Sequence, residues 1–180
     1  MARRAPGQDP TATRRKESDE PYVLCGLLDG VTTGAPLCAI VHNTNQRSKD
    51  YENLRVHPRP GHADYTAYVK YGNHHDVRGG GHFSGRMTAP LVFAGAVARQ
   101  ILSRRGIQVA SHVASIGGVA DTPFDPVSIP SEWMDRLSRE YFPVIDPEAK
   151  ERMRQEVEAA RKDGDSVGGV VECAVTGLPV

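Results

Sequence analysis

The stretch TAPLVFAGAVARQILSRR, Thr88 to Arg105, carries the clearest structural signal in the sequence. Its apolar and small residues recur with the 3.6-residue period of an α-helix: Leu91, Ala94, Gly95, Ala98, Ile101 and Leu102. Pro90 suits the first turn of a helix, and Gly106 suits the position just after its end. We therefore predict a helix over Thr88–Arg105.

Further elements are expected on both sides of this helix. Two short apolar runs, Tyr22–Leu28 and Ala35–Val41, are separated by turn-forming residues and predict a β-hairpin. The other expected elements are a short helix within Gly61–Tyr71, a strand over Ile107–Ile116, a helix from its N-cap Asp146 to Lys162 and a strand over Val170–Val175. Residues 42–57 and 72–85 are expected to be loops. This mixture favours the α+β class.

The composition is that of a globular chain with no overall charge. Its 180 residues include 22 Lys or Arg and 22 Asp or Glu, which argues against a surface built for nucleic acid or an anionic membrane. No apolar run is long enough to span a bilayer, and the start of the chain lacks the apolar core of a secretion signal. The three cysteines form no CxxC pair, so neither a disulfide scaffold nor a zinc site is expected, and Cys25 and Cys38 are predicted core residues. We expect a soluble cytoplasmic protein.

Two arginine-rich segments are candidates for anion chemistry. Arg3 and Arg4, with the basic run 14–16, suit a polyanionic small ligand, or else belong to a solvated terminus. In Arg59-Pro-Gly-His62, proline and glycine would hold Arg59 and His62 in one geometry, where His62 could donate a proton near an anion. The alternative is a helix-capping turn with an exposed histidine.

The segment RGGGHFSGR, Arg78 to Arg86, directly precedes the predicted helix. Glycines let backbone N–H groups approach an anion, and the start of a helix favours negative charge, so the segment suits a phosphate-bearing cofactor. It matches neither the Rossmann nor the P-loop pattern, and it could also be a flexible surface loop. His74, His75 and His82 do not have the spacing of a metal site, so no metal is expected. Trp133 is interpreted as a packing residue.

Several ordered motifs together resemble chorismate synthases. They are RRAPG (3–7), RKESD (15–19), GVTTGAPL (30–37), RSKDY (47–51), RPGHADYTAYVKYG (59–72), RGGGHFSGRMTAPLVFAGAVA (78–98) and GDSVGG (164–169). The resemblance implies part of a β-α-β sandwich and a lyase that eliminates phosphate from 5-enolpyruvylshikimate-3-phosphate to give chorismate. It also implies reduced FMN as cofactor, NADPH as a candidate reductant, and a homotetramer of the intact enzyme in aromatic amino-acid biosynthesis.

The same resemblance assigns roles to individual residues. His62 matches the histidine that protonates reduced flavin, and the arginines that match substrate contacts are Arg4, Arg59 and Arg86. The FMN-contacting triplet corresponds to His82, Phe83 and Ser84, where many family members have Arg-Ser-Ser. Ala5 and Pro10 stand where many members have arginines, and Arg14 or Arg15 is a candidate replacement at Pro10.

The resemblance also implies a central fragment, without the family's opening GESHG segment and its C-terminal part. We expect one incomplete domain over residues 1–180, with a basic substrate-binding segment at 1–20, a portion of the sandwich at 21–180 and exposed apolar strand faces. Such a fragment alone is expected to be inactive. The alternatives are a non-catalytic anion- or flavin-binding fragment and, disfavoured by the neutral charge and few aromatic residues, an RNA-binding protein.

Overall fold

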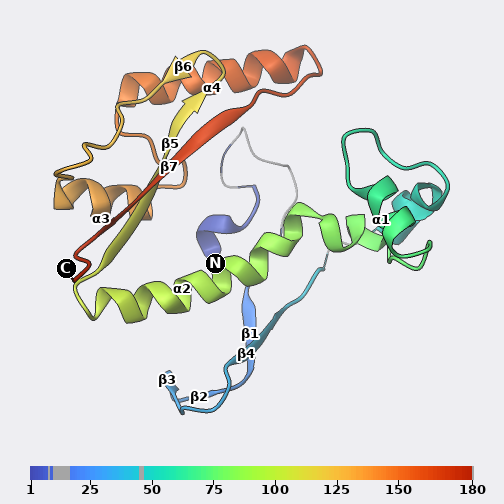
Figure 1. The fold of residues 1–180 in the computed structure, drawn as a ribbon, viewed down its shortest axis with the longest axis horizontal. Coiled ribbons are helices and arrows are strands. Elements are labelled where there is room, and N and C mark those ends of the chain that lie inside the picture. The colour runs from blue at the N-terminus through green and yellow to red at the C-terminus, as the bar shows by residue number, and fades with distance from the viewer. Residues whose placement is uncertain (8, 10–16, 45–46, 180) are drawn as a thin grey trace. The chain divides into compact units, whose positions relative to one another are not determined.

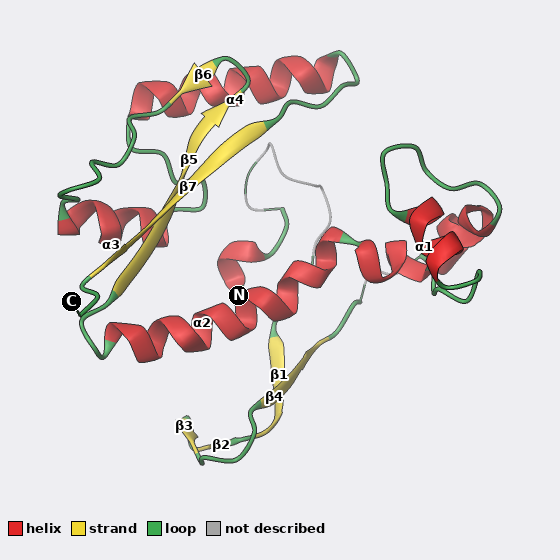
Figure 2. Cartoon of the chain, in the orientation of Figure 1, coloured by secondary structure: helices red, strands yellow, loops and turns green. Residues whose placement is uncertain are grey.

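The computed structural model describes residues 1–7, 9, 17–44 and 47–179 (Figure 1). The helices, with 3₁₀ helices marked η, are η1 Ala2–Arg4, η2 Ser48–Arg55, α1 Asp64–Lys70, η3 Arg78–Phe83, η4 Gly85–Met87, α2 Thr88–Ser103, α3 Ser131–Arg139 and α4 Pro147–Lys162. The strands are β1 Pro21–Cys25, β2 Leu27–Leu28, β3 Val31–Thr32, β4 Cys38–Val41, β5 Gln108–Ile116, β6 Val119–Ala120 and β7 Gly169–Thr176. Helices and small antiparallel sheets confirm the predicted α+β class (Figure 2).

The chain divides into two compact units. The first unit comprises Met1–Pro6 and Arg15–Gly95, and the second comprises Gly7–Arg14 and Ala96–Val180. Helix α2 starts in the first unit and ends in the second. Among the described residues, no helix combines the length and hydropathy that crossing a membrane requires.

The first unit contains the predicted hairpin. Strands β1 and β4 pair antiparallel from Pro21↔Val41 to Cys25↔Cys38, with a bulge between Val23 and Cys25. The prediction that the two cysteines lie in the core is wrong, because both are exposed. Strands β1 and β4 form a sheet of only two strands, and the side chains of Cys25 and Cys38 lie on a part of it that is open to solvent.

The second unit is a three-stranded antiparallel sheet, in the order β6-β5-β7, packed against two helices. Met134 and Leu137 of α3 pack with Ala110 of β5, and Trp133 packs against the same cluster, as predicted for that residue. Ala149 and Met153 of α4 form a second buried cluster. Only one face of the sheet carries this core, and Cys173 and Val175 of β7 are exposed.

Most predicted elements are present, but α3 was not expected. Its two buried apolar side chains, Met134 and Leu137, have the spacing of one helix face, but its nine residues are fewer than the roughly 11 to 18 over which a helical period is read. The region 42–57, expected as a loop, contains the 3₁₀ helix η2, and the glycine-rich loop contains η3.

Candidate active site

Arg4 and Arg86 line the same cavity in the first unit. The cavity has a volume of about 410 Å³, and Ser84 together with residues of β4 and η3 completes its wall. Arg4 donates from Nε and Nη2 to the hydroxyl of Thr88, at 3.2 and 3.1 Å, and its Nη1 forms an ion pair with Asp19. These contacts join the start of the chain to the first residue of α2.

Arg86 has fewer partners than Arg4. Its Nη1 and Nη2 atoms are buried and have no hydrogen-bond partner among the described residues. The nearest counter-charge is Oε1 of Glu17, which lies 3.7 Å from Nη2 and also lacks a hydrogen bond in that part of the chain. Because a buried charge without its hydrogen bonds is unfavourable, Arg86 offers unused donors to an anion that enters the cavity.

On the η3 side of the cavity, the backbone has a conformation that only glycine adopts readily. Gly79, Gly80 and Gly81 have φ values of 64°, 87° and 67°, in the left-handed region. A Cβ atom on Gly81 would lie 2.4 Å from the carbonyl oxygen of Asp76. The loop therefore keeps a tight fold with no side chains between its backbone and the cavity. Ser84 caps the next turn by accepting a hydrogen bond from the N–H of Arg86 at 3.3 Å.

Arg59 and His62 are joined by Asp64, the first residue of α1. Oδ1 of Asp64 lies 2.7 Å from Nδ1 of His62 and accepts from Nη2 of Arg59 at 3.0 Å. Oδ2 accepts from Nε of Arg59 at 2.8 Å and from its backbone N–H at 3.1 Å. The hydrogen bonds from Arg59 hold the pKa of Asp64 well below its usual range. The same side-chain hydrogen bond raises the pKa of Arg59.

The three residues predicted to contact FMN do not all line the cavity that Arg4 and Arg86 share. Ser84 lines it, whereas His82 and Phe83 line a second cavity of about 310 Å³, which Asp64 also lines. The rings of His82 and Phe83 are arranged edge to face, with their centroids 6.0 Å apart. Gly81 lines both cavities, so η3 forms a wall between them. In the described part of the chain, no three His, Cys, Asp or Glu side chains are arranged to hold a metal ion.

The structure thus brings some predicted site residues together and separates others. Arg4, Arg86 and Ser84 share one cavity, while Arg59 and His62 line neither of the two cavities. The candidate replacements Arg14 and Arg15 lie outside the described residues.

The acidic partners of the site arginines were not predicted. They are Glu17, Asp19 and Asp64. Asp64 lies in the same motif as its partner Arg59, so the sequence contained a local signal for that pair. Glu17 and Asp19 pair with arginines outside their own motif, so no local signal announced those pairs.

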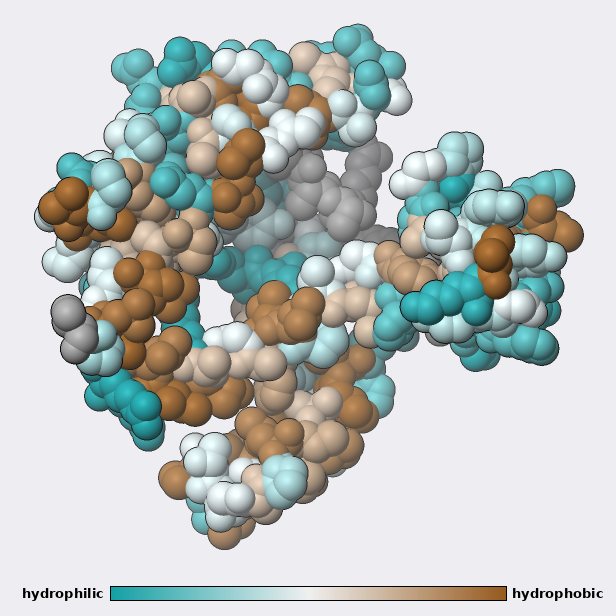
Figure 3. Space-filling view, in the orientation of Figure 1, coloured by the Kyte–Doolittle hydropathy of each residue, from teal (hydrophilic) through white to brown (hydrophobic). Residues whose placement is uncertain are grey.

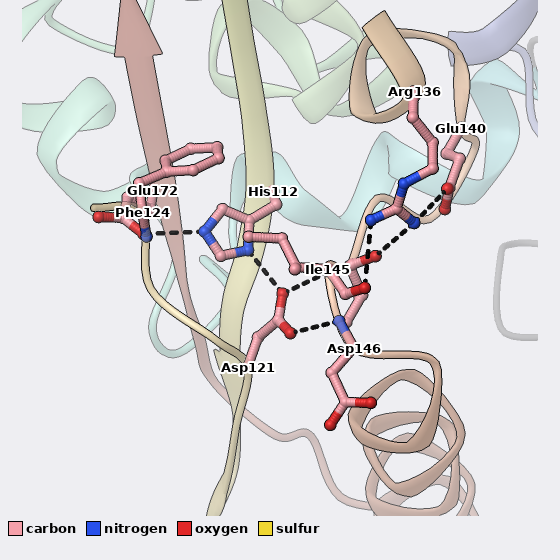
Figure 4. Close-up of polar contacts among 9 residues, drawn as sticks. His112, Asp121, Phe124, Arg136, Glu140, Ile145, Asp146 and Glu172 are labelled. Carbon is pink, nitrogen blue, oxygen red and sulfur yellow. Dashed lines mark hydrogen bonds and ion pairs between the residues drawn. The ribbon is translucent and has the colours of Figure 1, made fainter. Parts of the chain in front are cut away.

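The second unit contains a buried polar cluster around His112 (Figure 4). The His112 side chain is fully buried, with Nδ1 2.7 Å from Oδ2 of Asp121 and Nε2 2.8 Å from Oε2 of Glu172. His112 and Glu172 face each other across β5 and β7. Asp121 also accepts from the backbone N–H groups of Ile145 and Asp146, at 2.7 and 2.9 Å. The cluster therefore ties β5 and β7 to the start of α4.

Comparisons with known proteins identify the family to which this chain is similar. The family model for chorismate synthase matches residues 1–180. The chain is 46% identical over 179 residues to the chorismate synthase of Aeropyrum pernix and 45% identical over 168 residues to that of Thermococcus gammatolerans. These matches cover 99% and 93% of this chain.

The same comparisons show how much of the relatives the chain spans. The two matches cover 46% and 45% of the relatives, so the chain spans about half of their length. A solved structure titled as a chorismate synthase superposes with a TM-score of 0.66 at 26% identity, over 88% of this chain and 44% of that one. On this evidence, the chain belongs to the chorismate synthase family.

Proposed function

We propose that this chain supplies part of a chorismate synthase active site, in which phosphate and a ring proton are eliminated from 5-enolpyruvylshikimate-3-phosphate. Chorismate synthases are lyases of aromatic amino-acid biosynthesis, and the chain belongs to that family. The observation that carries the proposal is Arg86, whose buried guanidinium has unused donors on a cavity that Arg4 also lines. A guanidinium pair suits a substrate with two carboxylates and a phosphate.

Each site residue has a distinct task in this proposal. Arg86 binds an anionic group of the substrate, and Arg4, fixed by Thr88 and Asp19, orients it. Ser84 lies on the same cavity wall, within reach of a bound molecule. His62 holds a proton for transfer and keeps its orientation through Asp64.

The residues present also fit a phosphate-bearing cofactor such as reduced FMN. The three left-handed glycines leave their backbone free of side chains, and the unused donors of Arg86 lie on the same cavity. We assign His82, Phe83 and Ser84 to cofactor binding. Bound reduced FMN would supply reversible electron density without a net redox change. NADPH is a candidate source of its electrons.

A binding experiment tests the site in this chain. The chain is titrated calorimetrically with 5-enolpyruvylshikimate-3-phosphate and with shikimate, which lacks the phosphate and the enolpyruvyl group. We expect the phosphorylated substrate to bind and Arg86→Ala to weaken its binding roughly 10- to 100-fold, the scale of one charged hydrogen-bonding partner. Arg99→Ala, an exposed arginine of α2, is the matched control and should bind normally. Equal binding of the two compounds, or no effect of Arg86→Ala, contradicts the proposal.

Phosphate release distinguishes catalysis from binding alone. The chain is mixed anaerobically with substrate and chemically reduced FMN, and inorganic phosphate and chorismate are measured. Because the chain spans about half of its relatives, we expect substrate binding without turnover by the chain alone. We expect turnover once the parts of a relative that this chain does not span are added. Binding that never leads to turnover favours the second candidate function, a non-catalytic anion- or flavin-binding fragment. A homotetramer is expected for the complete assembly, and light scattering measures its mass.

A further inference from the structure

We propose that Asp64 is a positioning residue that fixes the proton of neutral His62 on Nδ1 and leaves Nε2 as the nitrogen that exchanges a proton. Asp64 is 5% exposed and stands at the start of α1, two residues after His62. Its Oδ1 atom lies 2.7 Å from Nδ1 of His62. The inference extends the proposed function, because it says at which atom His62 would act.

The carboxylate of Asp64 can only accept hydrogen bonds. Three donors of Arg59 converge on it, from the backbone N–H, Nε and Nη2, at 3.1, 2.8 and 3.0 Å. These bonds stabilise the ionised form, which has no proton to give. A hydrogen bond between Oδ1 and Nδ1 of His62 therefore requires that Nδ1 carry the hydrogen.

The position of Arg59 is consistent with this tautomer, which the contact with Asp64 selects. Its Nη2 atom lies 3.2 Å from both Nδ1 and Nε2 of His62. A guanidinium only donates, so it needs a ring nitrogen with a free lone pair. With Nδ1 protonated, only Nε2 can accept. Free histidine in water favours the opposite tautomer, with the proton on Nε2, so the site reverses an intrinsic preference.

This arrangement defines the path of a transferred proton. Nδ1 stays bonded to Asp64 in both protonation states, because it donates in each of them. When Nε2 takes up a proton, Nη2 of Arg59 loses its acceptor there, and the ring forms an ion pair with Asp64. When Nε2 gives the proton away, the contact with Arg59 forms again. Asp64 therefore acts through His62 and Arg59.

Nuclear magnetic resonance tests the tautomer directly. The chain is labelled with ¹⁵N-histidine, and long-range ¹H–¹⁵N correlation spectra are recorded at a pH where the ring is neutral. His62→Gln identifies the His62 signals among the seven histidines. We expect the Nδ1–H tautomer to exceed the Nε2–H tautomer by about tenfold or more, because charge-assisted hydrogen bonds are strong. No substrate or cofactor is needed, so the result does not depend on whether the chain binds either.

Variants separate the role of Asp64 from a general loss of structure. Asp64→Ala should invert the ratio in favour of Nε2–H, whereas Arg59→Lys should keep Nδ1–H because the carboxylate remains. Asp76→Ala removes a similar aspartate–arginine pair, with Arg78, that forms no hydrogen bond or ion pair with His62 in the described part of the chain, and it should change nothing. The ring signals of His75, whose nitrogens are buried in the same unit as Asp64, report whether each variant keeps that unit folded. A dominant Nε2–H tautomer in the unmodified chain, or Nδ1–H retained in folded Asp64→Ala, overturns the proposal.

Discussion

Four arginines of the first unit each lie beside a carboxylate. The pairs are Arg4–Asp19, Arg59–Asp64, Arg78–Asp76 and Arg86–Glu17. Positive charge is thus positioned and largely compensated before any ligand binds. The acids should therefore also influence affinity for anions, with a smaller effect than the arginines have.

Glu17→Gln should increase the affinity of the chain for inorganic phosphate. The substitution removes a negative charge 3.7 Å from Nη2 of Arg86 and keeps a side chain of the same size. We expect a gain of about threefold to tenfold in the association constant, measured by calorimetry at low ionic strength and reduced by added salt. Glu20→Gln, an exposed acid in the same segment, is the control. Unchanged or weaker binding contradicts this account of the cavity.

Glu172 should make the stability of the second unit depend on pH. Its pKa is lowered from the ordinary 4.5, first by the backbone N–H of Phe124 and then by His112. A lowered folded-state pKa contributes stability above the ordinary value, and this contribution is lost as the pH falls through the folded-state pKa. Glu172→Gln should therefore cost about 1 kcal/mol near pH 6, and this difference in the free energy of unfolding should narrow as the pH falls below the ordinary 4.5 and through the folded-state pKa. Urea unfolding at several pH values measures it, and a constant gap would falsify the assignment.

For individual residues, the sequence predicted the arginines of the site better than the acidic residues that pair with them. Arg4, Arg59 and Arg86 came from motifs, and all three occupy charged clusters. The pairing of Arg86 with Glu17 joins residues 69 positions apart (86 − 17), so no local pattern contained it. A net charge of zero means that acidic and basic residues are equal in number, but it does not indicate which of them form ion pairs.

Helix α4 begins at a side-chain cap that contributes to stability. Asp146 accepts a hydrogen bond from the N–H of Glu148 at 2.9 Å, and Pro147 occupies the first turn. Asp146→Ala should lower the free energy of unfolding by about 1 kcal/mol, since an N-cap satisfies an otherwise unpaired donor. Asp163→Ala, at the opposite end, is the matched control and should be neutral or slightly stabilising, because an acid there opposes the helix dipole. Urea unfolding followed by circular dichroism measures both variants.

The hairpin places two free thiols opposite each other. Cys25 and Cys38 are register partners of β1 and β4, and both are exposed. Facing residues in antiparallel strands have Cα atoms about 4.5–5.5 Å apart, within the range that a disulfide spans. Incubation with oxidised glutathione should therefore link them: one thiolate forms a mixed disulfide, and the other displaces the second glutathione.

Mass spectrometry of alkylated peptides measures this reaction. We expect Cys25 and Cys38 to be joined, while Cys173 carries the alkyl group or a glutathione. In Cys25→Ser, Cys38 should keep the glutathione because its partner is absent. Stable glutathione on both cysteines of the unmodified hairpin would contradict the register of β1 and β4.

The elements that sequence predicted are those with local signals. Helix α2 has a full apolar period, and α4 has its cap, so both were found with nearly correct ends. Helix α3 was missed because its nine residues are fewer than those over which a helical period is read. The pairing of Gln108 with Thr176 joins strands separated by two helices, and only tertiary packing selects it.

Each of the two units has apolar side chains exposed on its surface. Hydrophobic residues gather on the hairpin of the first unit, as Figure 3 shows, and include Tyr22, Leu24, Leu28, Val31 and Ile40. In the second unit, Val170 and Val171 of β7 are 58% and 68% exposed. We expect the chain alone to bind the dye anilinonaphthalene sulfonate and to self-associate as concentration rises. Light scattering and dye fluorescence measure this, and a chain that stays monomeric at every concentration and does not bind the dye would contradict it.

The contact between Gly81 and Asp76 also limits which mutations the gene tolerates. Every missense change in a glycine codon adds a Cβ atom, and at this position that atom would meet a carbonyl oxygen at 2.4 Å. A random mutational scan should therefore find no functional missense allele at this codon, even among the smallest replacements. Gly85, where an added Cβ meets nothing within 4 Å, should accept alanine in the same library. The two codons, four positions apart, are predicted to differ sharply in their tolerance of heritable change.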